Sequence, residues 1–407
     1  MGTIKYTRLA APLTLPCGHV IPNRFIKGAM TEQMSDRHNA PTEALVRLYE
    51  RWGRGGCGCL LTGNVMVDRR ALEGPRNVAV EDERDLPMLR RWAEAAQANG
   101  SQLWMQISHP GRQTPRGVSS EVVAPSAVAL KGQVGLMFTK PRALTEGEIH
   151  ELIQRFARTA GIAKEAGFAG IQIHSAHGYL NSQFLTPLVN QRTDQWGGSL
   201  ENRMRFLLAV VRQTREAVGA NYPIAVKLNS ADFQRGGFTE EESMAVVRAL
   251  EVAGIDLLEI SGGSYERPVM VGSGMPEQRD STRRREAYFL EYAEKVRKET
   301  RVPLMLIGGL RSPMVMEGIL ADGAVDVIGV ARPMALDPDF CRKAIAGEVE
   351  RAHEADLRTG LRSLDDMLQS LWHQEQFKLM SEGKEPNLRL GKWGALGRGL
   401  ANIFGPR

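Results

Sequence analysis

The sequence predicts an α/β fold: a parallel (β/α)8 or TIM barrel with a loop subdomain after the third strand and a C-terminal helical extension. Three observations predict it. Short apolar segments rich in β-branched residues recur along the chain, and segments with helical charge patterning lie between them. Eight such apolar segments are present, the number that closes a parallel barrel. The chain has 407 residues, of which 43% are hydrophobic, so it is long enough for one enlarged barrel.

The predicted strands are short apolar runs rich in β-branched residues. They cover residues 25–29, 59–63, 102–107, 170–173, 224–228, 257–260, 304–307 and 327–330. An open, doubly wound sheet is the alternative arrangement of the same units. It is disfavoured because no Gly-x-Gly-x-x-Gly pattern follows the first strand, and we therefore expect a closed barrel.

Helix starts are signalled in the segments between strands. Thr145 with Glu148, and Thr239 with Glu242, have the spacing of a capping box, in which the two side chains satisfy each other's backbone N–H groups. Ser199 can cap a helix over residues 200–218 in the same way. These starts fall between predicted strands, so local and global patterns agree.

Two parts of the chain do not follow the alternation of strands and helices expected for a barrel. Residues 109–144 form an unusually long connection, and such loops are usually lids or carry short structure of their own. We expect a small hairpin arm over residues 134–140. The barrel domain is expected to cover residues 1–350, and residues 351–407 form the extension. Within the extension, residues 358–380 have the spacing of a helix with one apolar face.

Composition and charge disfavour several classes of protein. The net charge is +5, and Lys and Arg are dispersed with few aromatic residues between them, which does not suit a nucleic-acid surface. Four cysteines are too few for a disulfide scaffold of this length. No signal segment or stretch of transmembrane length is present. We therefore expect a cytoplasmic protein that acts on a small molecule, away from membranes; the sequence leaves a homo-oligomer open.

Residues 169–206 carry the most chemical information. An apolar run changes abruptly to His174, His177 and Tyr179, so a buried strand delivers polar side chains at its carboxyl end, where parallel barrels have their active sites. Two histidines at this spacing could bind a metal, pack in a core, or donate hydrogen bonds to one oxygen. A metal is disfavoured because further ligands at closed spacing are missing nearby. Paired donors beside a phenol fit acid chemistry on a carbonyl substrate better than a polar core does.

This stretch resembles the signature of a known family. The matching positions run in order and without gaps: His174-x-x-His177-Gly178-Tyr179-Leu180, then Phe184-Leu185-x-Pro187-x-x-Asn190-x-Arg192-x-Asp194-x-Trp196-Gly197-Gly198-Ser199, then Asn202-Arg203. The chain here resembles the Old Yellow Enzyme family of FMN-dependent oxidoreductases. Asn23-Arg24-Phe25 to Met30-Thr31 also resembles the first-strand motif of that family.

A flavin needs donors at its pyrimidine edge, a cation near its N1/C2 carbonyl and an anion site for its phosphate. Gln106 and Lys227, near the ends of the third and fifth predicted strands, are candidates for the first two. Barrels commonly bind phosphate in the loops after strands seven and eight. The chain has Gly308-Gly309 and Ala331-Arg332 there; glycines let backbone amides approach a phosphate, and an arginine binds it with a fork.

The resemblance implies specific roles for residues at the carboxyl ends of the predicted strands. Ala29 and Met30 would give backbone contacts, Thr31 would lie against the flavin O4/N5 edge, and Gly63 would flank the isoalloxazine ring. Gln106 and Lys227 would bind the pyrimidine, although many relatives have Arg at the position of Lys227. His174 and His177 would hold the carbonyl oxygen of the substrate, and Tyr179 would be the proton donor. Tyr265 and Arg267 lie where a substrate contact could be.

The implied activity is the reduction of electron-poor alkenes such as α,β-unsaturated carbonyls, with FMN as cofactor and NADPH or NADH as reductant. Flavin N5 would pass hydride to the β-carbon, and Tyr179 would protonate the α-carbon. One alternative is another flavin chemistry on the same scaffold, oxidative demethylation or dienoyl-thioester reduction. The larger relatives with those activities carry an iron–sulfur cluster, for which Cys341 alone after the eighth strand is insufficient. A flavin-free barrel that binds a phosphorylated ligand is the other alternative.

Overall fold

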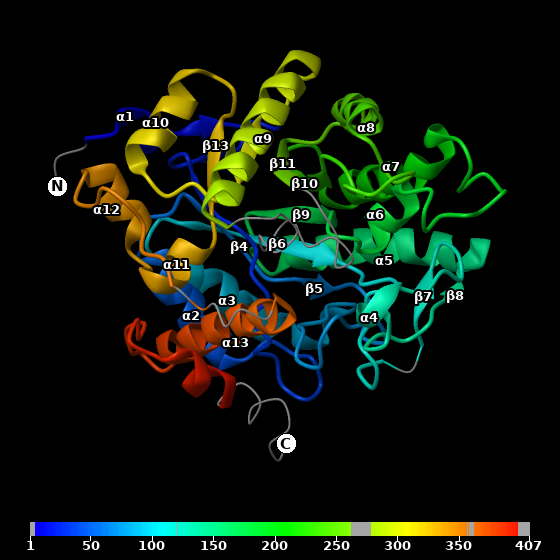
Figure 1. Cartoon of the computed structure of the whole chain (residues 1–407), viewed down its shortest axis with the longest axis horizontal. Coiled ribbons are helices and arrows are strands. Elements are labelled where there is room, and N and C mark those ends of the chain that lie inside the picture. The colour runs from blue at the N-terminus through cyan, green and yellow to red at the C-terminus, as the bar shows by residue number, and fades with distance from the viewer. Residues whose placement is uncertain (1–4, 120, 262–277, 356, 358–361, 398–407) are drawn as a thin grey trace.

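Eight parallel strands form the centre of the computed structural model, which describes residues 5–119, 121–261, 278–355, 357 and 362–397 (Figure 1). The strands are β3 (Phe25–Lys27), β4 (Cys59–Leu61), β6 (Gln102–Ser108), β9 (Gly170–Ser175), β10 (Ile224–Asn229), β11 (Leu257–Ser261), β12 (Leu304–Ile307) and β13 (Val327–Val330). They pair in the order β4-β3-β13-β12-β11-β10-β9-β6, and a pairing between β6 and β4 closes the ring. The predicted (β/α)8 barrel is confirmed. A short strand, β5 (Val65–Met66), extends the edge of β6.

Strand bounds agree with the prediction at β12 and β13 and differ by one or two residues elsewhere. The first two strands end two residues earlier than predicted, and a glycine whose position has no room for a side chain lies just beyond each. A Cβ atom on Gly28 would lie 2.1 Å from Ile307, and one on Gly63 would lie 2.1 Å from Glu32. β9 instead continues past its predicted end, and His174 lies opposite Lys227 of β10 within the sheet.

Helices surround the barrel on its outer side, as Figure 1 shows. The longer ones are α2 (Glu43–Gly53), α3 (Leu86–Gln97), α5 (Glu146–Glu165), α7 (Leu200–Val218), α8 (Glu240–Val252), α9 (Gln278–Glu299) and α10 (Pro313–Ala321). The capping boxes predicted from Thr145 and Thr239 form at the starts of α5 and α8. Ser199 caps α7, which has the predicted bounds. None of the described helices combines the length and the apolar character needed to cross a membrane.

An N-terminal hairpin, which the sequence did not indicate, closes the barrel at the amino ends of its strands. It consists of β1 (Leu13–Thr14) and β2 (Val20–Ile21), paired antiparallel, and follows the short helix α1 (Thr7–Ala10). Leu15 and Ile21 pack with residues near the strand starts, such as Trp104 and Met305. With one end filled by apolar side chains, the opposite end is left for a ligand site.

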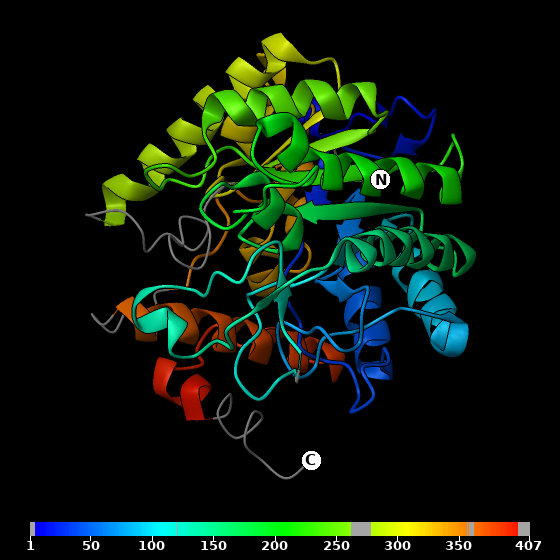
Figure 2. The ribbon, with the colours of Figure 1, turned by 90° about the vertical axis from the view of Figure 1, so that its right-hand side faces the viewer.

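The long connection after β6 forms the expected subdomain, but with different internal structure. It contains β7 (Val123–Ala124), α4 (Gly132–Gly135) and β8 (Arg142–Ala143), and β7 and β8 pair in parallel. The hairpin predicted over residues 134–140 is wrong, because α4 occupies the start of that segment and β8 pairs with a strand further back. Figure 2 shows this subdomain in cyan at the same end of the barrel as the orange C-terminal helix.

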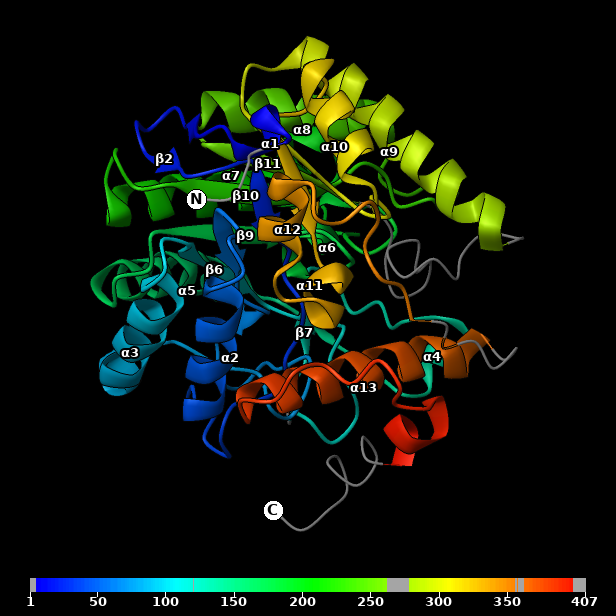
Figure 3. The same cartoon turned by 90° about the vertical axis from the view of Figure 1, so that its left-hand side faces the viewer.

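The C-terminal region packs on the outside of the barrel. It contains α11 (Arg332–Leu336), α12 (Phe340–Ala346) and α13 (Arg362–Ser381), and α13 contacts α2 and α11. The helix predicted over residues 358–380 is therefore present in its described part. Figure 3 shows α13 and α9 on opposite sides of the barrel. The division of the chain at residue 350 stays a prediction.

Candidate active site

A cavity of about 250 Å³ lies at the carboxyl ends of the barrel strands. Eight of the predicted site residues line it: Ala29, Met30, His177, Lys227, Gly308, Gly309, Ala331 and Arg332. The sequence had placed these residues at the ends of five different strands or in the loops that follow them. The barrel brings them to one opening, in the position typical of active sites in this fold.

The cavity has a cationic lining. Lys227, Arg311 and Arg332 line it, and no Asp or Glu is among the described residues that do so. All three cations are held by neighbours: Arg332 donates to Gln369 Oε1 of α13 at 3.1 Å, Arg311 Nε lies 3.0 Å from Glu354, and Lys227 Nζ lies 2.8 Å from Glu259. Three cations without a lining carboxylate favour an anionic ligand.

The turn after β12 has a backbone that suits close approach of a ligand. Gly308 has φ +126° and Gly309 has φ +76°, values that glycine adopts without strain. No heavy atom lies within 4 Å of the position where a Cβ of Gly308 would be. The turn therefore leaves open space beside its backbone within a cationic cavity, which is the arrangement expected for a phosphate site.

A buried polar chain crosses four neighbouring strands beneath the cavity. Lys227 Nζ lies 2.8 Å from Glu259, which is fully buried on β11. Gln172 Nε2 donates to Glu259 at 2.8 Å, and Gln106 Nε2 donates to Gln172 at 2.6 Å. Gln106 and Lys227 are thus joined through two residues that the sequence did not single out. A carboxylate inside the apolar run of β11 was the signal that could have indicated Glu259.

His174 and His177 lie close together at the end of β9, with ring centroids 5.1 Å apart. The pKa of each imidazole is well below its ordinary value because of burial; the charge of Lys227 adds to this effect in both, and His177 adds to it in His174. Both rings are therefore neutral near pH 7. His174 Nδ1 accepts from the Ala176 N–H at 3.2 Å, which leaves the proton on Nε2 as a donor.

His177 is held by its backbone and its ring. Its φ of 60° lies in the left-handed region, which is uncommon for a residue with a side chain and recurs at functional sites. Its N–H donates to Asn229 at 3.1 Å, and its Nε2 lies 2.7 Å from Ser261 Oγ. Ser261 also lines the cavity and had not been predicted.

Tyr179 lies beside the histidine pair, with its ring centroid 4.7 Å from that of His174. It precedes the short helix α6 (Leu180–Leu185) and is 4% exposed. Its hydroxyl donates to the carboxylate of Glu73, which also accepts from the hydroxyl of Thr31 at 2.8 Å. Two predicted site residues from separate parts of the chain thus converge on one carboxylate that sequence reasoning did not indicate.

Gly63 lies behind this region rather than in the cavity lining. Its N–H donates to the buried carboxylate of Glu32 at 2.8 Å. Burial raises the pKa of Glu32, and the charge of the buried Lys27 opposes the rise. Lys27 had not been predicted as notable, although it stands in an apolar strand as Lys227 does.

The remaining predicted positions divide into two groups. His174, Tyr179, Thr31, Gly63 and Gln106 do not line the cavity and lie beside or beneath it, with the contacts given above. Tyr265 and Arg267 lie outside the described residues. Gln369, which lines the cavity from α13, could not have been found by any local pattern, because its only relevant partner is 37 residues earlier in the chain.

The residues present fit FMN. An anionic phosphate would meet the open glycine turn after β12 and Arg332, and the ammonium of Lys227 would face the part of the ligand nearest the strand ends. The donor set combines cations, amides and backbone N–H groups, which is the chemistry a phosphorylated heterocycle requires.

Fold and cavity together define a parallel-barrel protein with a cationic cavity at the carboxyl ends of its strands. A sequence model of the NADH:flavin oxidoreductase / NADH oxidase family matches residues 8–350, and the chain belongs to this family. The family contains oxidoreductases, and the resemblance to Old Yellow Enzyme is confirmed. Residues 351–407, including α13, lie beyond the matched region.

Relatives and solved structures agree with this assignment. The NADH-dependent flavin oxidoreductase iliE of Hypocrea jecorina is 38% identical over 349 residues, which are 80% of this chain and 86% of that protein. A 2-naphthoyl-CoA reductase in complex with 2-naphthoyl-CoA superposes with a TM-score of 0.78 at 27% identity, over 85% of this chain but only 54% of the other. An old yellow enzyme homologue from Zymomonas mobilis has a TM-score of 0.71 at 23% identity, over 84% of this chain and 94% of the other, and supports the fold.

Proposed function

We propose that this protein reduces the C=C bond of electron-poor alkenes, the α,β-unsaturated carbonyl compounds, with FMN as cofactor and NADH or NADPH as reductant. The observation that carries the proposal is the cluster of His174, His177 and Tyr179 beside a cationic cavity. The three rings lie within 5.1 Å of their neighbours, and both imidazoles are neutral near pH 7. Neutral donors and a phenol suit a substrate that gains electrons at carbon and charge at a carbonyl oxygen.

The chain would hold FMN with residues that line the cavity and with Gln106, which lies beneath it. Gly308, Gly309 and Arg332 would bind the phosphate, while Lys227 and Gln106 would bind the ring system. When bound, FMN supplies the hydride chemistry, which it takes from a reduced nicotinamide. Ala29 and Met30 line the same cavity and would shield its wall from water.

His174 and His177 would bind the carbonyl oxygen of the alkene substrate. His174 carries its proton on Nε2, so it donates a hydrogen bond without losing the proton. As negative charge develops on the oxygen, a donor fixed in a buried site stabilises it more than bulk water does. His177, fixed by Asn229 and Ser261, would complete the pair.

Tyr179 would donate the proton that completes the reduction. Its phenol O–H bond breaks as a C–H bond forms at the α-carbon, and solvent returns the proton afterwards. The ring is held against His174, so the donor and the oxyanion pair lie on one side of the substrate.

Two measurements test the proposal as a whole. The purified protein should show an oxidised-flavin absorbance band at roughly 450 nm. Anaerobic mixing should bleach this band with NADH or NADPH, and an α,β-unsaturated ketone should restore it. A colourless protein that takes up no FMN would overturn the proposal, and so would bleached enzyme that no alkene reoxidises. Since iliE of Hypocrea jecorina is named NADH-dependent, NADH is the first reductant to try.

Replacement of Tyr179 by Phe separates the two half-reactions. The alkene half-reaction should slow by about 100-fold or more, because general acids contribute about 10²–10⁴-fold. Bleaching by NADH should change less than about twofold, since no proton is given to carbon in that step. Single-turnover stopped-flow absorbance measures both rates. Equal losses in both would show that Tyr179 has a structural role instead.

Reduction of an unsaturated CoA thioester is the second candidate. It is favoured by the structural similarity to a reductase solved with 2-naphthoyl-CoA. The same anaerobic assay with enones and enoyl thioesters side by side decides between the two, because the better substrate restores the flavin band at the lower concentration.

A further inference from the structure

Glu73 is the point where four polar side chains from separate segments meet. Oε1 accepts from the Thr31 hydroxyl at 2.8 Å and from Asn77 Nδ2 at 3.2 Å. Oε2 accepts from Asn64 Nδ2 at 2.6 Å and from the hydroxyl of Tyr179. The carboxylate is partly buried, whereas the ring of Tyr179 is almost fully buried.

The composition of this shell is unusual for a carboxylate that is partly removed from water. All four partners are neutral, and within the described residues no Lys or Arg nitrogen lies within 4.0 Å of Glu73. A carboxylate without a cation costs more to bury than an amide of the same shape. The four donors meet both oxygens of Glu73, and an amide of the same shape would present its NH2 group to two of them, so the site requires a carboxylate.

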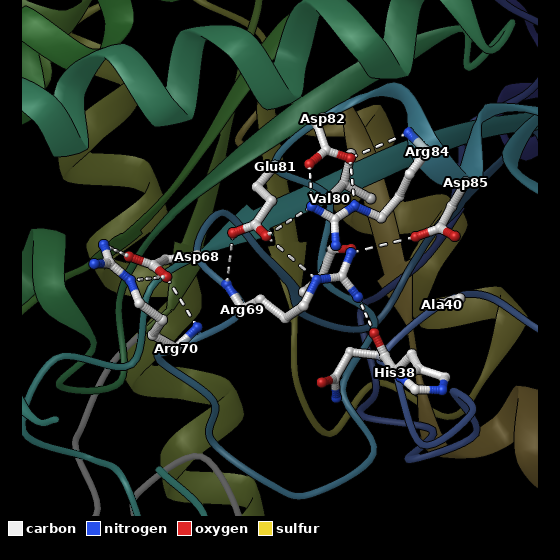
Figure 4. A network of polar contacts seen from close by, with 12 residues as sticks. His38, Ala40, Asp68, Arg69, Arg70, Val80, Glu81, Asp82, Arg84 and Asp85 are labelled. Carbon is white, nitrogen blue, oxygen red and sulfur yellow. Dashed lines mark hydrogen bonds and ion pairs between the residues drawn. The ribbon is translucent and has the colours of Figure 1, made fainter. Parts of the chain in front are cut away.

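The loop that carries Glu73 is anchored on both sides. It runs from β5 to the 3-10 helix η1 (Glu83–Asp85). Figure 4 shows Arg69, just before Glu73, reaching Glu81 at 3.4 Å and Asp85 at 3.3 Å, both of which follow it. Arg70 also contacts Asp68 at 2.7 Å. The ion pairs of Arg69 tie the start of the loop to its end, and that of Arg70 fixes its start, so the position of Glu73 is set by a rigid support.

We propose that Glu73 is the positioning residue of Tyr179: its carboxylate fixes the phenol beside the histidine pair and keeps it protonated until a substrate is present. This inference rests on the proposed role of Tyr179 as proton donor. A negative charge next to the phenol oxygen disfavours the phenolate, so the phenol keeps its proton while no substrate is bound. Rotation of the hydroxyl about its C–O bond then turns the proton from Glu73 to the α-carbon without movement of heavy atoms.

The same carboxylate also fixes the hydroxyl of Thr31, in the segment after β3. Displacement of Glu73 would therefore disturb two groups at the rim of the site together. The single carboxylate thus couples the segment after β3 to the segment after β9.

The first test measures the phenol directly and needs no turnover. The holoenzyme is labelled with ¹³C at tyrosine Cζ, and the Tyr179→Phe variant assigns one signal among the seven tyrosines. In Glu73→Gln the signal of Tyr179 should titrate at a lower pH than in the wild type, because the neighbouring negative charge is gone. Glu83→Gln is the matched control: it removes the same charge from an exposed residue of η1 and should leave the midpoint unchanged. An unchanged midpoint in Glu73→Gln would overturn the inference.

The second test measures the consequence for turnover. In Glu73→Gln, the alkene half-reaction should slow by about tenfold, a part of the 10²–10⁴-fold that a general acid contributes. Bleaching by NADH should change less than about twofold. Glu73→Asp, which keeps the charge and the two acceptor oxygens, should recover part of the loss, and an alkene step as slow as that of Glu73→Gln would argue against a role for the carboxylate. If Tyr179→Phe itself has no effect on the alkene step, the proposed function fails, while the titration still decides whether Glu73 controls the phenol.

Discussion

Two lysines stand inside barrel strands, and their surroundings differ in an instructive way. Lys27 of β3 is fully buried and Lys227 of β10 is 5% exposed. Lys27 donates to the carbonyl oxygens of Leu61 at 2.7 Å and Gly28 at 3.1 Å, and its ammonium lies 4.5 Å from the centroid of the Trp52 ring. Lys227 has its ion pair with Glu259 beneath it and the cavity above it. One lysine is enclosed by protein groups, and the other faces a space that a ligand can enter.

The comparison shows that a charged residue in an apolar strand does not by itself mark a binding site. Burial is costly in both cases, and both are stabilised by acceptors. The two lysines differ in whether the protein supplies all of the groups that contact the ammonium. The sequence shows the charge but not the partners, because those partners come from residues up to 34 positions away for Lys27 and 32 for Lys227.

The largest expected effect is that of Lys227→Met. The affinity for FMN should fall by about 100-fold, since a charge-assisted hydrogen bond contributes about 1.5–3 kcal/mol. The free energy of unfolding should also fall by about 3–5 kcal/mol, because Glu259 is left as an uncompensated buried charge. Fluorescence titration with FMN and thermal denaturation of the apoprotein measure the two quantities.

A double variant separates these two effects. Lys227→Met combined with Glu259→Gln removes the buried charge and should restore most of the stability without restoring the affinity for FMN. Wild-type affinity in the double variant would show that Lys227 serves only to neutralise Glu259 and that the two lysines do not differ in function.

Lys27→Met should lower the stability less than Lys227→Met does, and it should leave the affinity for FMN nearly unchanged. Replacement leaves two buried carbonyl groups without their donor and removes the cation near Glu32, so the free energy of unfolding should fall by about 1–3 kcal/mol. The Kd for FMN should change less than about threefold. A loss of FMN affinity as large as that of Lys227→Met, at temperatures where the variant is folded, would contradict the distinction.

The sequence was sufficient for those features that rest on local periodicity. Apolar runs and capping boxes predicted all eight barrel strands and the starts of α5, α7 and α8, because each depends on neighbours within a few residues. The turn glycines and Arg332 were predicted to lie together because a parallel barrel fixes which strand ends meet. These site assignments stay predictions until a ligand is bound.

Other features depend on pairings that no local pattern contains. Glu73 was missed because a glutamate in a polar loop is ordinary, and only the fold brings it to Tyr179, 106 residues later. Gln369 was missed because only the fold brings it to the cavity, where it accepts from Arg332, 37 residues earlier in the chain. The hairpin expected over residues 134–140 was wrong because short segments of mixed polarity have no strong preference, and packing decided for α4.

The effect that is smallest within any one pH unit is a pH dependence of the free energy of unfolding, and it comes from Lys27. Burial lowers the pKa of Lys27 from 10.5 to about 8, and the charge of Glu32 opposes this shift. Below pH 8 the lysine is protonated in both the folded and the unfolded state. Between about pH 8 and 10.5 the unfolded chain still holds a proton that the folded protein has lost, so stability rises with pH, by at most about 1.4 kcal/mol per pH unit.

This contribution can be isolated by comparing the wild type with Lys27→Met across that window. The phenol of Tyr49, whose ring is near Lys27 and whose pKa burial and the charge of Glu32 raise well above 10, lowers the stability near pH 10 in both proteins, so its contribution cancels in the comparison. The free energy of unfolding of the wild type, from urea denaturation at fixed pH, should rise relative to that of the variant between pH 8 and 10.5. Below pH 7 the difference in free energy of unfolding between the two proteins should not change with pH. A difference that stays constant from pH 7 to 10.5 would mean that Lys27 is protonated in the folded protein throughout, and that its two carbonyl acceptors and the ring of Trp52 fully replace its hydration.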